Sequence, residues 1–133
     1  MKYGFRLKEN MEVDISYVSD DKIVVVKTHG YADAKSSSEM VKSIMLAMKE
    51  HRSLRCLLDH TEINFITGKT IEVFNRPEEI KNTGMPLNVR LAAVIPERYK
   101  EHFRFLETVC ENRGINYRVF SNNTSAINWL KTE

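Results

Sequence analysis

The sequence has little of what identifies several specialised classes of protein. Its formal net charge is only +2, and its 20 basic residues are interspersed with 18 acidic ones. That balance argues against a nucleic-acid binder, because such proteins usually concentrate their basic residues on one face. The longest strongly apolar runs, residues 23–26 and 91–95, have the length of single strands and are too short to span a bilayer. We therefore expect neither nucleic-acid binding nor stable membrane insertion.

Cysteine is scarce, and its two copies are not placed for a disulfide. Cys56 falls in an expected strand and Cys110 in an expected helix, each among apolar neighbours. Both are interpreted as small buried hydrophobic residues of a protein in a reducing compartment. Residues 1–6 lack the apolar centre of a secretory signal peptide, which also favours a cytoplasmic location.

What the sequence does have is the composition of a folded domain. Hydrophobic residues make up 42% of it and charged residues 29%, values typical of a soluble globular protein. A chain of 133 residues fits one domain and hides roughly two-thirds of its surface on folding. We predict one domain over residues 1–133, with a core that needs no disulfide, metal or cofactor.

Several segments have the pattern of strands. Residues 12–18 alternate between apolar and polar side chains, which is typical of a strand with one solvent-exposed face. A turn joins them to residues 22–29, which contain the continuous apolar run 23–26, so a hairpin with a buried second strand is predicted. Residues 3–7 also alternate, which leaves room for an additional edge strand. Further strands are predicted at residues 54–59, 88–95 and 115–120.

A helix is predicted directly after the hairpin. Its apolar residues recur with the spacing i, i+3, i+4, i+7, and two N-terminal caps compete for its start. Asp33 is one candidate cap, and the pair Ser36 and Glu39, which has the spacing of a capping box, is the other. The apolar stripe consists of Val41, Ile44, Met45 and Met48.

Three further helices complete the pattern. Residues 70–81 form the first, and we expect a break or a restart at Pro77, because proline lacks the amide donor of a helical hydrogen bond. The second covers residues 96–113, and the third, residues 124–130, places Trp129 on an apolar surface. Strands joined by single helices run parallel. The predicted fold is α/β, with the order ββαβαβαβα and a mixed, mostly parallel sheet of about five strands with helices on its faces.

Four segments carry a resemblance to a known family: His29-Gly30-Tyr31, Leu57-Leu58-Asp59, residues 90–95 and residues 112–130. On these segments the chain resembles the SpoIIAA-like, or STAS-like, family of small bacterial proteins. That family shares its fold with anti-sigma-factor antagonists and with the lipid-binding region of Sec14-type proteins. The resemblance covers residues 11–130 and consists of fold signatures, so it implies this architecture and, by analogy, a regulatory role.

The resemblance implies one comparison at a single residue. Anti-sigma-factor antagonists carry a phosphorylatable serine after the aspartate that ends the equivalent strand, in an Asp-Ser-Ser-Gly motif at a helix N-terminus. This chain has Asp59-His60-Thr61-Glu62 there, so Thr61 is the candidate phosphoacceptor. Glu62 replaces the glycine and would repel a phosphate. We therefore favour a structural hydroxyl or a helix cap at Thr61 over a phosphorylation switch.

The predicted functional surface is the rim where the parallel strands end, because ligands of open α/β sheets bind there. Asp59 and His60 point to opposite faces of a strand, so they do not form a catalytic pair. The four histidines lie on different elements without the spacing of metal ligands, and we expect neither a catalytic nor a metal site. The rim residues are His29, Tyr31, Asp59, His60, Thr61, Phe65 and Pro96.

Residues 62–66 are expected to form a loop or an early helix turn at this rim. Their apolar side chains either cap the core or, with Met85 and Leu87, form a hydrophobic rim for an acyl chain or a partner helix. Capping the core is the favoured interpretation.

Two functions remain open. The first is a non-enzymatic regulatory or binding module that contacts a protein partner or a second copy of itself. The alternative is a carrier or sensor of a small apolar or nucleotide ligand at the rim. An enzyme that uses His29 or His60 is the least favoured. We expect the rim to be filled or shallow, whereas a deep closed apolar cavity would favour the carrier.

Overall fold

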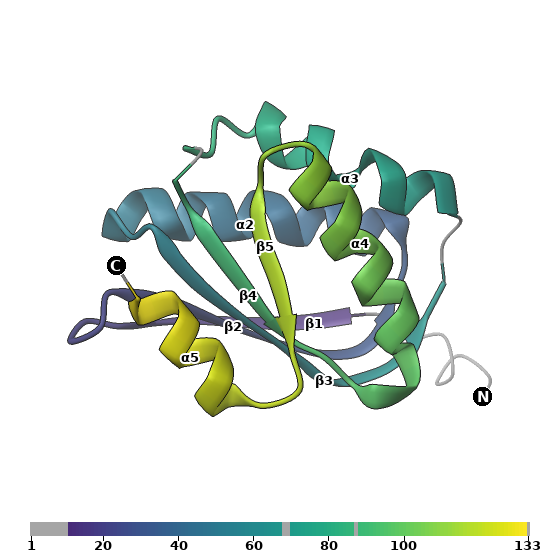
Figure 1. Ribbon diagram of the computed structural model, residues 1–133, viewed down its shortest axis with the longest axis horizontal. Coiled ribbons are helices and arrows are strands. Elements are labelled where there is room, and N and C mark those ends of the chain that lie inside the picture. The colour runs from purple at the N-terminus through teal and green to yellow at the C-terminus, as the bar shows by residue number, and fades with distance from the viewer. Residues whose placement is uncertain (1–10, 68–69, 87, 133) are drawn as a thin grey trace, which may run out of the picture.

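The computed structural model describes residues 11–67, 70–86 and 88–132 (Figure 1). The additional edge strand considered at residues 3–7 lies outside these ranges, as does Leu87. The described residues form the strands β1 (Met11–Val18), β2 (Ile23–Ala32), β3 (Arg55–Ile66), β4 (Arg90–Val94) and β5 (Asn116–Phe120). The helices are α2 (Ala34–His51), α3 (Thr70–Asn82), the short 3-10 helix η1 (Glu97–Tyr99), α4 (Lys100–Asn112) and α5 (Asn123–Lys131).

The strands form one sheet in the order β1-β2-β3-β4-β5, which is also their order in the chain. β1 and β2 are antiparallel, and every later pair is parallel. β3 therefore lies between two parallel neighbours in the middle of the sheet. The predicted α/β class, the element order and the mixed, mostly parallel sheet are confirmed.

The helices cover the two faces of the sheet unequally (Figure 1). α2, α3 and α4 pack on one face, where they contribute Ile44, Ile80 and Phe103 to the larger core. α5, yellow in Figure 1, packs on the opposite face, where Ala126 and Leu130 have no exposed surface. α5 packs mainly on β3, β4 and β5. At the start of β2, Ile23 is buried in the same cluster as Leu130 of α5. No described helix packs on β1, the second half of β2 and the end of β3 on this side, and we call that area the open face.

β4 shows why a strand with helices on both faces has a continuous apolar run. Leu91 and Ala93 pack in the core under α2, α3 and α4, while Ala92 and Val94 pack under α5. Alternate residues of a strand point to opposite faces, so a strand with helices on both sides has no solvent-exposed positions.

Both cysteines are free and buried, as predicted. Burial raises the pKa of the Cys110 thiol to about 12, and it raises the pKa of Cys56 as well. Both thiols therefore stay protonated near neutral pH and pack as small apolar side chains.

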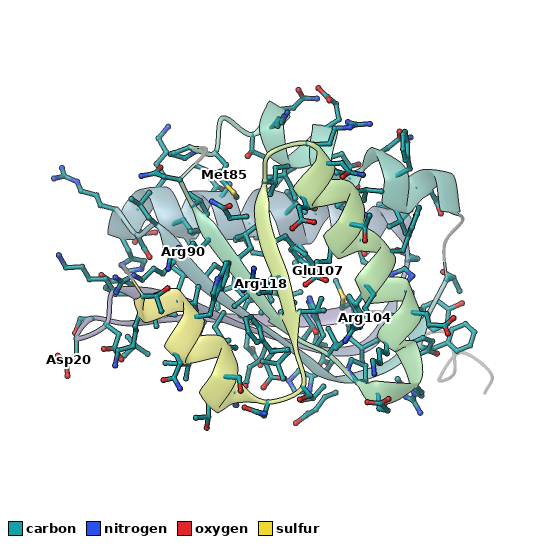
Figure 2. All side chains as sticks on the ribbon, viewed as in Figure 1. Asp20, Met85, Arg90, Arg104, Glu107 and Arg118 are labelled. Atoms are coloured by element: carbon teal, nitrogen blue, oxygen red, sulfur yellow. The ribbon has the colours of Figure 1, made fainter. Side chains whose placement is uncertain are left out.

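The indole of Trp129 docks beside the sheet, as predicted. It is partly buried, and its ring lies 5.8 Å from that of Phe120. The guanidinium groups of Arg90 and Arg118, both near α5 in Figure 2, lie 5.5 and 5.4 Å from the indole. Arg90 Nη1 also donates to the carbonyl of Trp129 at 2.8 Å. These contacts fix the end of α5 on the sheet.

α2 begins with a capping box at Asp33. The Asp33 carboxylate accepts the backbone N–H of Ser36 at 2.8 Å, and Ser36 Oγ accepts the backbone N–H of Asp33 at 3.0 Å. Of the two predicted caps, Asp33 is the one in use, and its partner is Ser36 rather than Glu39. The bond from Ser36 lowers the pKa of Asp33, because it stabilises the ionised carboxylate.

The predicted break at Pro77 is wrong, because α3 is continuous with Pro77 inside it. Pro77 is among the fully buried side chains. Tertiary packing of its ring therefore offsets the helical hydrogen bond that proline cannot donate. Across the described ranges, none of the helices combines the length and the hydropathy needed to cross a membrane.

Candidate functional site

β3 is longer than predicted. The expectation of a loop or helix turn at residues 62–66 is wrong, because β3 continues through this segment. Relative to β2, β3 gains one residue between Asp59 and Glu62 and another between Ile63 and Phe65. Such β-bulges bend and twist a strand, and here they also interrupt the alternation of apolar and polar residues. The interrupted alternation is why the sequence pattern does not indicate a strand.

The shifted register brings two chemically distinct pairs together on the open face. His29 lies opposite Glu62, and Tyr31 lies opposite Phe65. Between the two residues of β2, Gly30 has a φ of 92°, a left-handed conformation that glycine adopts without a steric penalty. The bulges of β3 and this glycine therefore position one polar pair and one aromatic pair side by side.

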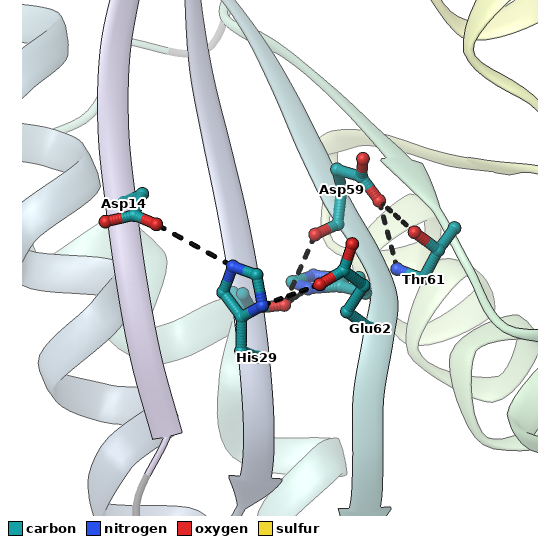
Figure 3. A network of polar contacts seen from close by, with 7 residues as sticks. Asp14, His29, Asp59, Thr61 and Glu62 are labelled. Carbon is teal, nitrogen blue, oxygen red and sulfur yellow. Dashed lines mark hydrogen bonds and ion pairs between the residues drawn. The ribbon is translucent and has the colours of Figure 1, made fainter.

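Five polar residues from three strands meet at the first pair (Figure 3). His29 Nδ1 lies 2.7 Å from Glu62 Oε1, and its Nε2 lies 3.7 Å from Asp14 Oδ2. The imidazole thus bridges carboxylates of β1 and β3. Both carboxylates are well exposed, so water screens these interactions. We call the following residues the polar cluster: Asp14, His29, Asp59, Thr61 and Glu62.

Asp59 holds the bulge that contains Thr61. One carboxylate oxygen, Oδ1, accepts both the backbone N–H of Thr61 at 3.0 Å and its hydroxyl at 2.6 Å. A side chain thereby satisfies an amide that the irregular pairing leaves without a strand partner. The interpretation of Thr61 as a helix cap is wrong, because the residue lies within β3. Phosphorylation of this exposed hydroxyl stays a prediction, and the Asp59 carboxylate would oppose it.

The second pair is aromatic. The rings of Tyr31 and Phe65 stack with centroids 5.2 Å apart and an angle of 28° between their planes. Phe65 is 48% exposed, so a large part of its ring faces solvent rather than the core. The favoured expectation that the apolar side chains of residues 62–66 cap the core therefore holds for buried Ile63 but not for Phe65. We call Tyr31 and Phe65 the aromatic pair.

Arg98 fixes the outer part of β3 from the other side. β4 ends at Val94, which pairs with Asp59, so β3 extends past the end of its neighbour. Arg98 Nη2 donates to the carbonyls of Ile63 at 3.2 Å and Asn64 at 2.7 Å, where a longer β4 would have paired. Sequence reasoning missed this residue, since its partners lie more than thirty positions away and no local pattern marks the contact.

Two of the predicted rim residues do not join this surface. His60 is 3% exposed and lies on the other face of the sheet, where its ring stacks on Phe103 at 5.3 Å. Burial lowers the pKa of His60 to about 4, so the ring is neutral at pH 7. Pro96 lies between β4 and η1, as the N-cap residue of the short helix that contains Arg98.

The surface also has two hollows. An open depression of about 320 Å³ lies at the ends of β4 and β5, lined by Lys100, Arg104, Ser121 and Ser125 among others. An apolar cavity of about 100 Å³ lies on the opposite side of the sheet from the open face. The expectation of a filled or shallow rim is therefore only partly met. The apolar cavity is nevertheless smaller than typical ligand sites, which have volumes of about 300 Å³ or more. In the part of the chain that the structure covers, no three His, Cys, Asp or Glu side chains are grouped to hold a metal ion.

Three solved structures are similar to this chain over nearly their whole lengths. An anti-sigma factor antagonist from Mycobacterium paratuberculosis has a TM-score of 0.61 and 10% identity, with 93% of this chain and 97% of that chain covered. An uncharacterised protein with a SpoIIAA-like fold from Shewanella loihica has a TM-score of 0.56 and 16% identity, with 91% and 94% covered. The anti-sigma factor antagonist SpoIIAA in its unphosphorylated form has a TM-score of 0.51 and 12% identity, with 92% and 100% covered. No protein-family model matches the sequence, and no curated protein does.

At these identities the similarity is one of fold. The chain has the SpoIIAA-like architecture that its sequence resemblance implied. Thr61, the residue compared above with the phosphorylatable serine of anti-sigma-factor antagonists, lies in a bulge inside the long strand β3.

Proposed function

We propose that this protein is a non-enzymatic regulatory module that binds another protein through the open face. Two proteins of the same fold are described as anti-sigma factor antagonists, which supports a role in regulation through protein contacts. The observation that carries the proposal is the exposed aromatic pair beside the polar cluster. Binding energy at protein interfaces is concentrated in a few aromatic and arginine side chains surrounded by polar residues.

Hydrogen bonds within the chain order the open face without a partner. Hydrogen bonds from Thr61 to Asp59 and from Arg98 to the carbonyl of Asn64 hold the bulged strand up to the residue before Phe65. A surface that is already ordered loses less conformational entropy on binding than a loop does. A strand-borne aromatic pair therefore suits recognition of a folded partner or helix.

Charge indicates the chemistry of the partner. Glu12 and Asp14 of β1 point to the same side, since they are two residues apart on one strand. With Asp59 and Glu62 they give the open face four carboxylates, and Lys27, which pairs with Asp14 and Asp59 across the strands, is the lysine among them. A basic surface with an apolar centre complements this arrangement. A second copy of the same acidic surface does not, so self-association is expected to use another face.

Native mass spectrometry of the protein purified from its host tests the proposal. We expect a stoichiometric second protein, and we expect the double variant Tyr31→Ala/Phe65→Ala to bind it at least about tenfold more weakly. Phe105→Ala is the matched control, because Phe105 is an exposed phenylalanine on α4, which packs on the opposite face. A partner that the double variant retains at full affinity, or a protein that carries only a small molecule, would contradict the proposal.

A further inference from the structure

An apolar cavity lies inside the fold, between the sheet and the layer of α2, α3 and α4. Its volume is about 100 Å³. The walls come from both the helices and the sheet, and the space is partly open to solvent, with Asp33, Ser37 and Glu72 among its lining residues. The apolar residues that define it include Val41, Ile44, Leu58, Ile63, Phe103 and Leu106.

The cavity wall carries a hydroxyl with no partner. Tyr117, on β5, is 6% exposed, and its hydroxyl oxygen is the one buried side-chain polar atom of the described residues without a hydrogen bond. Buried polar groups in folded proteins are almost always paired, so each exception needs an explanation. Burial also raises the pKa of Tyr117 well above its ordinary value, which keeps the hydroxyl protonated and able to donate.

His60 presents an acceptor to the same cavity. The hydroxyl of Thr28 donates to the carbonyl of Asp59 at 3.3 Å, and its oxygen lies 2.8 Å from His60 Nδ1. Thr28 has one hydroxyl proton, so both contacts are satisfied together only when His60 Nδ1 carries a proton and donates to it. Nε2 of His60 is then the unprotonated nitrogen, and the ring lines the cavity.

The cavity does not suit a charged molecule. Arg76 lines it, but its guanidinium donates to Ser38 and is paired with Glu79. A carboxylate ligand would compete with Glu79 for that cation. A cationic ligand would approach Arg76 and a neutral His60, and both carboxylates that line the space are already engaged, Asp33 in capping α2 and Glu72 in a contact of its own. Burying a charge without a free partner is costly, whereas an uncharged molecule meets a donor and an acceptor in an apolar enclosure.

We propose that this cavity binds a small, uncharged, mostly apolar molecule with one hydroxyl group, the size of a single aromatic ring. The ligand oxygen accepts the proton of the Tyr117 hydroxyl, and His60 Nε2 is available to accept a hydroxyl proton in return. A single ring is the upper limit of size, since an engineered cavity of about 150 Å³ in another protein binds benzene and this space has about 100 Å³ with an opening to solvent. The site lies across the sheet from the aromatic pair, so the inference is independent of the proposed partner surface.

Phenol and toluene are the probes, because they have nearly the same shape and only phenol has a hydroxyl. Titration of the full-length, isotopically labelled protein, followed by amide chemical shifts in NMR, is expected to show saturable shifts around Leu58 and Phe103. Phenol should bind about tenfold more tightly than toluene, the value of one hydrogen bond. Tyr117→Phe should reduce that preference, because only the acceptor His60 Nε2 then remains for the hydroxyl, and should leave the affinity for toluene unchanged.

Tyr31→Phe, the same substitution on the opposite face of the sheet, is the matched control and should keep the preference for phenol. Because Tyr117→Phe removes an unpaired polar group and retains the ring, the variant is expected to fold, which circular dichroism checks. Absence of saturable shifts with either probe would overturn the proposal. So would a preference for phenol that is as large in Tyr117→Phe as in the wild type.

Discussion

The guanidinium of Arg98 donates to the main-chain carbonyl of Asn64 at 2.7 Å, across the gap left where β4 ends. The contact joins η1, which follows β4, to the bulged end of β3. It also replaces the strand pairing that β3 lacks on that side, and thereby supports the surface assigned to partner binding.

Arg98→Ala should loosen the end of β3. Without the guanidinium, the carbonyls of Ile63 and Asn64 lose their bonds, and the free energy of unfolding should fall by about 1 kcal/mol. Amide hydrogen exchange should speed up selectively in residues 62–66. Arg104→Ala is the control, because Arg104 is an exposed arginine on α4. It should leave the amide exchange of residues 62–66 unchanged. Equal protection in wild type and Arg98→Ala would show that the contact does not hold the strand.

The buried His60 should make the fold sensitive to mild acid. Its pKa is lowered from 6.5 to about 4 in the folded protein. Between these values the unfolded chain binds a proton that the folded chain does not, so stability falls as the pH drops through this window. One pKa unit corresponds to about 1.4 kcal/mol, and the full loss is therefore about 3 kcal/mol.

Urea unfolding at pH 7.5 and pH 4.5 measures this loss. His60→Leu should remove most of the difference between the two conditions, while His51→Gln, at an exposed position at the end of α2, should retain it. If the pH dependence of His60→Leu equals that of the wild type, another group is responsible.

Leu130 should be a main support of α5. Its side chain has no exposed surface and packs between α5 and the sheet. Leu130→Ala should reduce the free energy of unfolding by about 2–5 kcal/mol, because a cavity forms in place of the side chain. Leu46→Ala, at a leucine of α2 that is 68% exposed, should change it by less than about 0.5 kcal/mol. Similar effects of the two substitutions in chemical denaturation would contradict the position of α5.

The capping box of α2 gives a smaller and separately testable effect. Asp33→Ala should lower stability by about 1 kcal/mol, whereas Asp33→Asn keeps an acceptor for the amide of Ser36 and should lose less. The pKa of Asp33 is lowered by that same bond. Its contribution is therefore present above 3.8, the ordinary pKa of the carboxyl, and disappears as the pH falls through the folded-state pKa. Thermal unfolding at neutral and acidic pH would show no such pH effect if the cap did not form.

The sequence predicts the sheet well where burial follows a regular period. The sequence identifies three strands directly, because exposure to solvent or to the core follows a regular pattern along each of them. They are the alternating residues 12–18 and the apolar runs of β2 and β4. Alternation also separates His60 from Asp59, and the structure places these neighbours on opposite faces.

The sequence does not predict features that depend on distant parts of the chain. The extra residues in β3 shift the alternation by one position, so the bulged half does not have the pattern of a strand. Pro77 stays helical because packing from other elements outweighs its local preference. The apolar cavity and the unpaired hydroxyl of Tyr117 are gaps between side chains of many elements, which no local pattern records.

The strands lie in the sheet in the order in which they are synthesised. A chain that grows from its N-terminus can add each new strand to the free edge of the previous one, and no strand has to insert between two that are already paired. The face beneath α5 is the last to be closed, since that helix follows all five strands. Until Asn123–Lys131 leaves the ribosome, Leu57, Ala92 and Val94 face solvent, which makes this side of the sheet the natural point of contact for a chaperone.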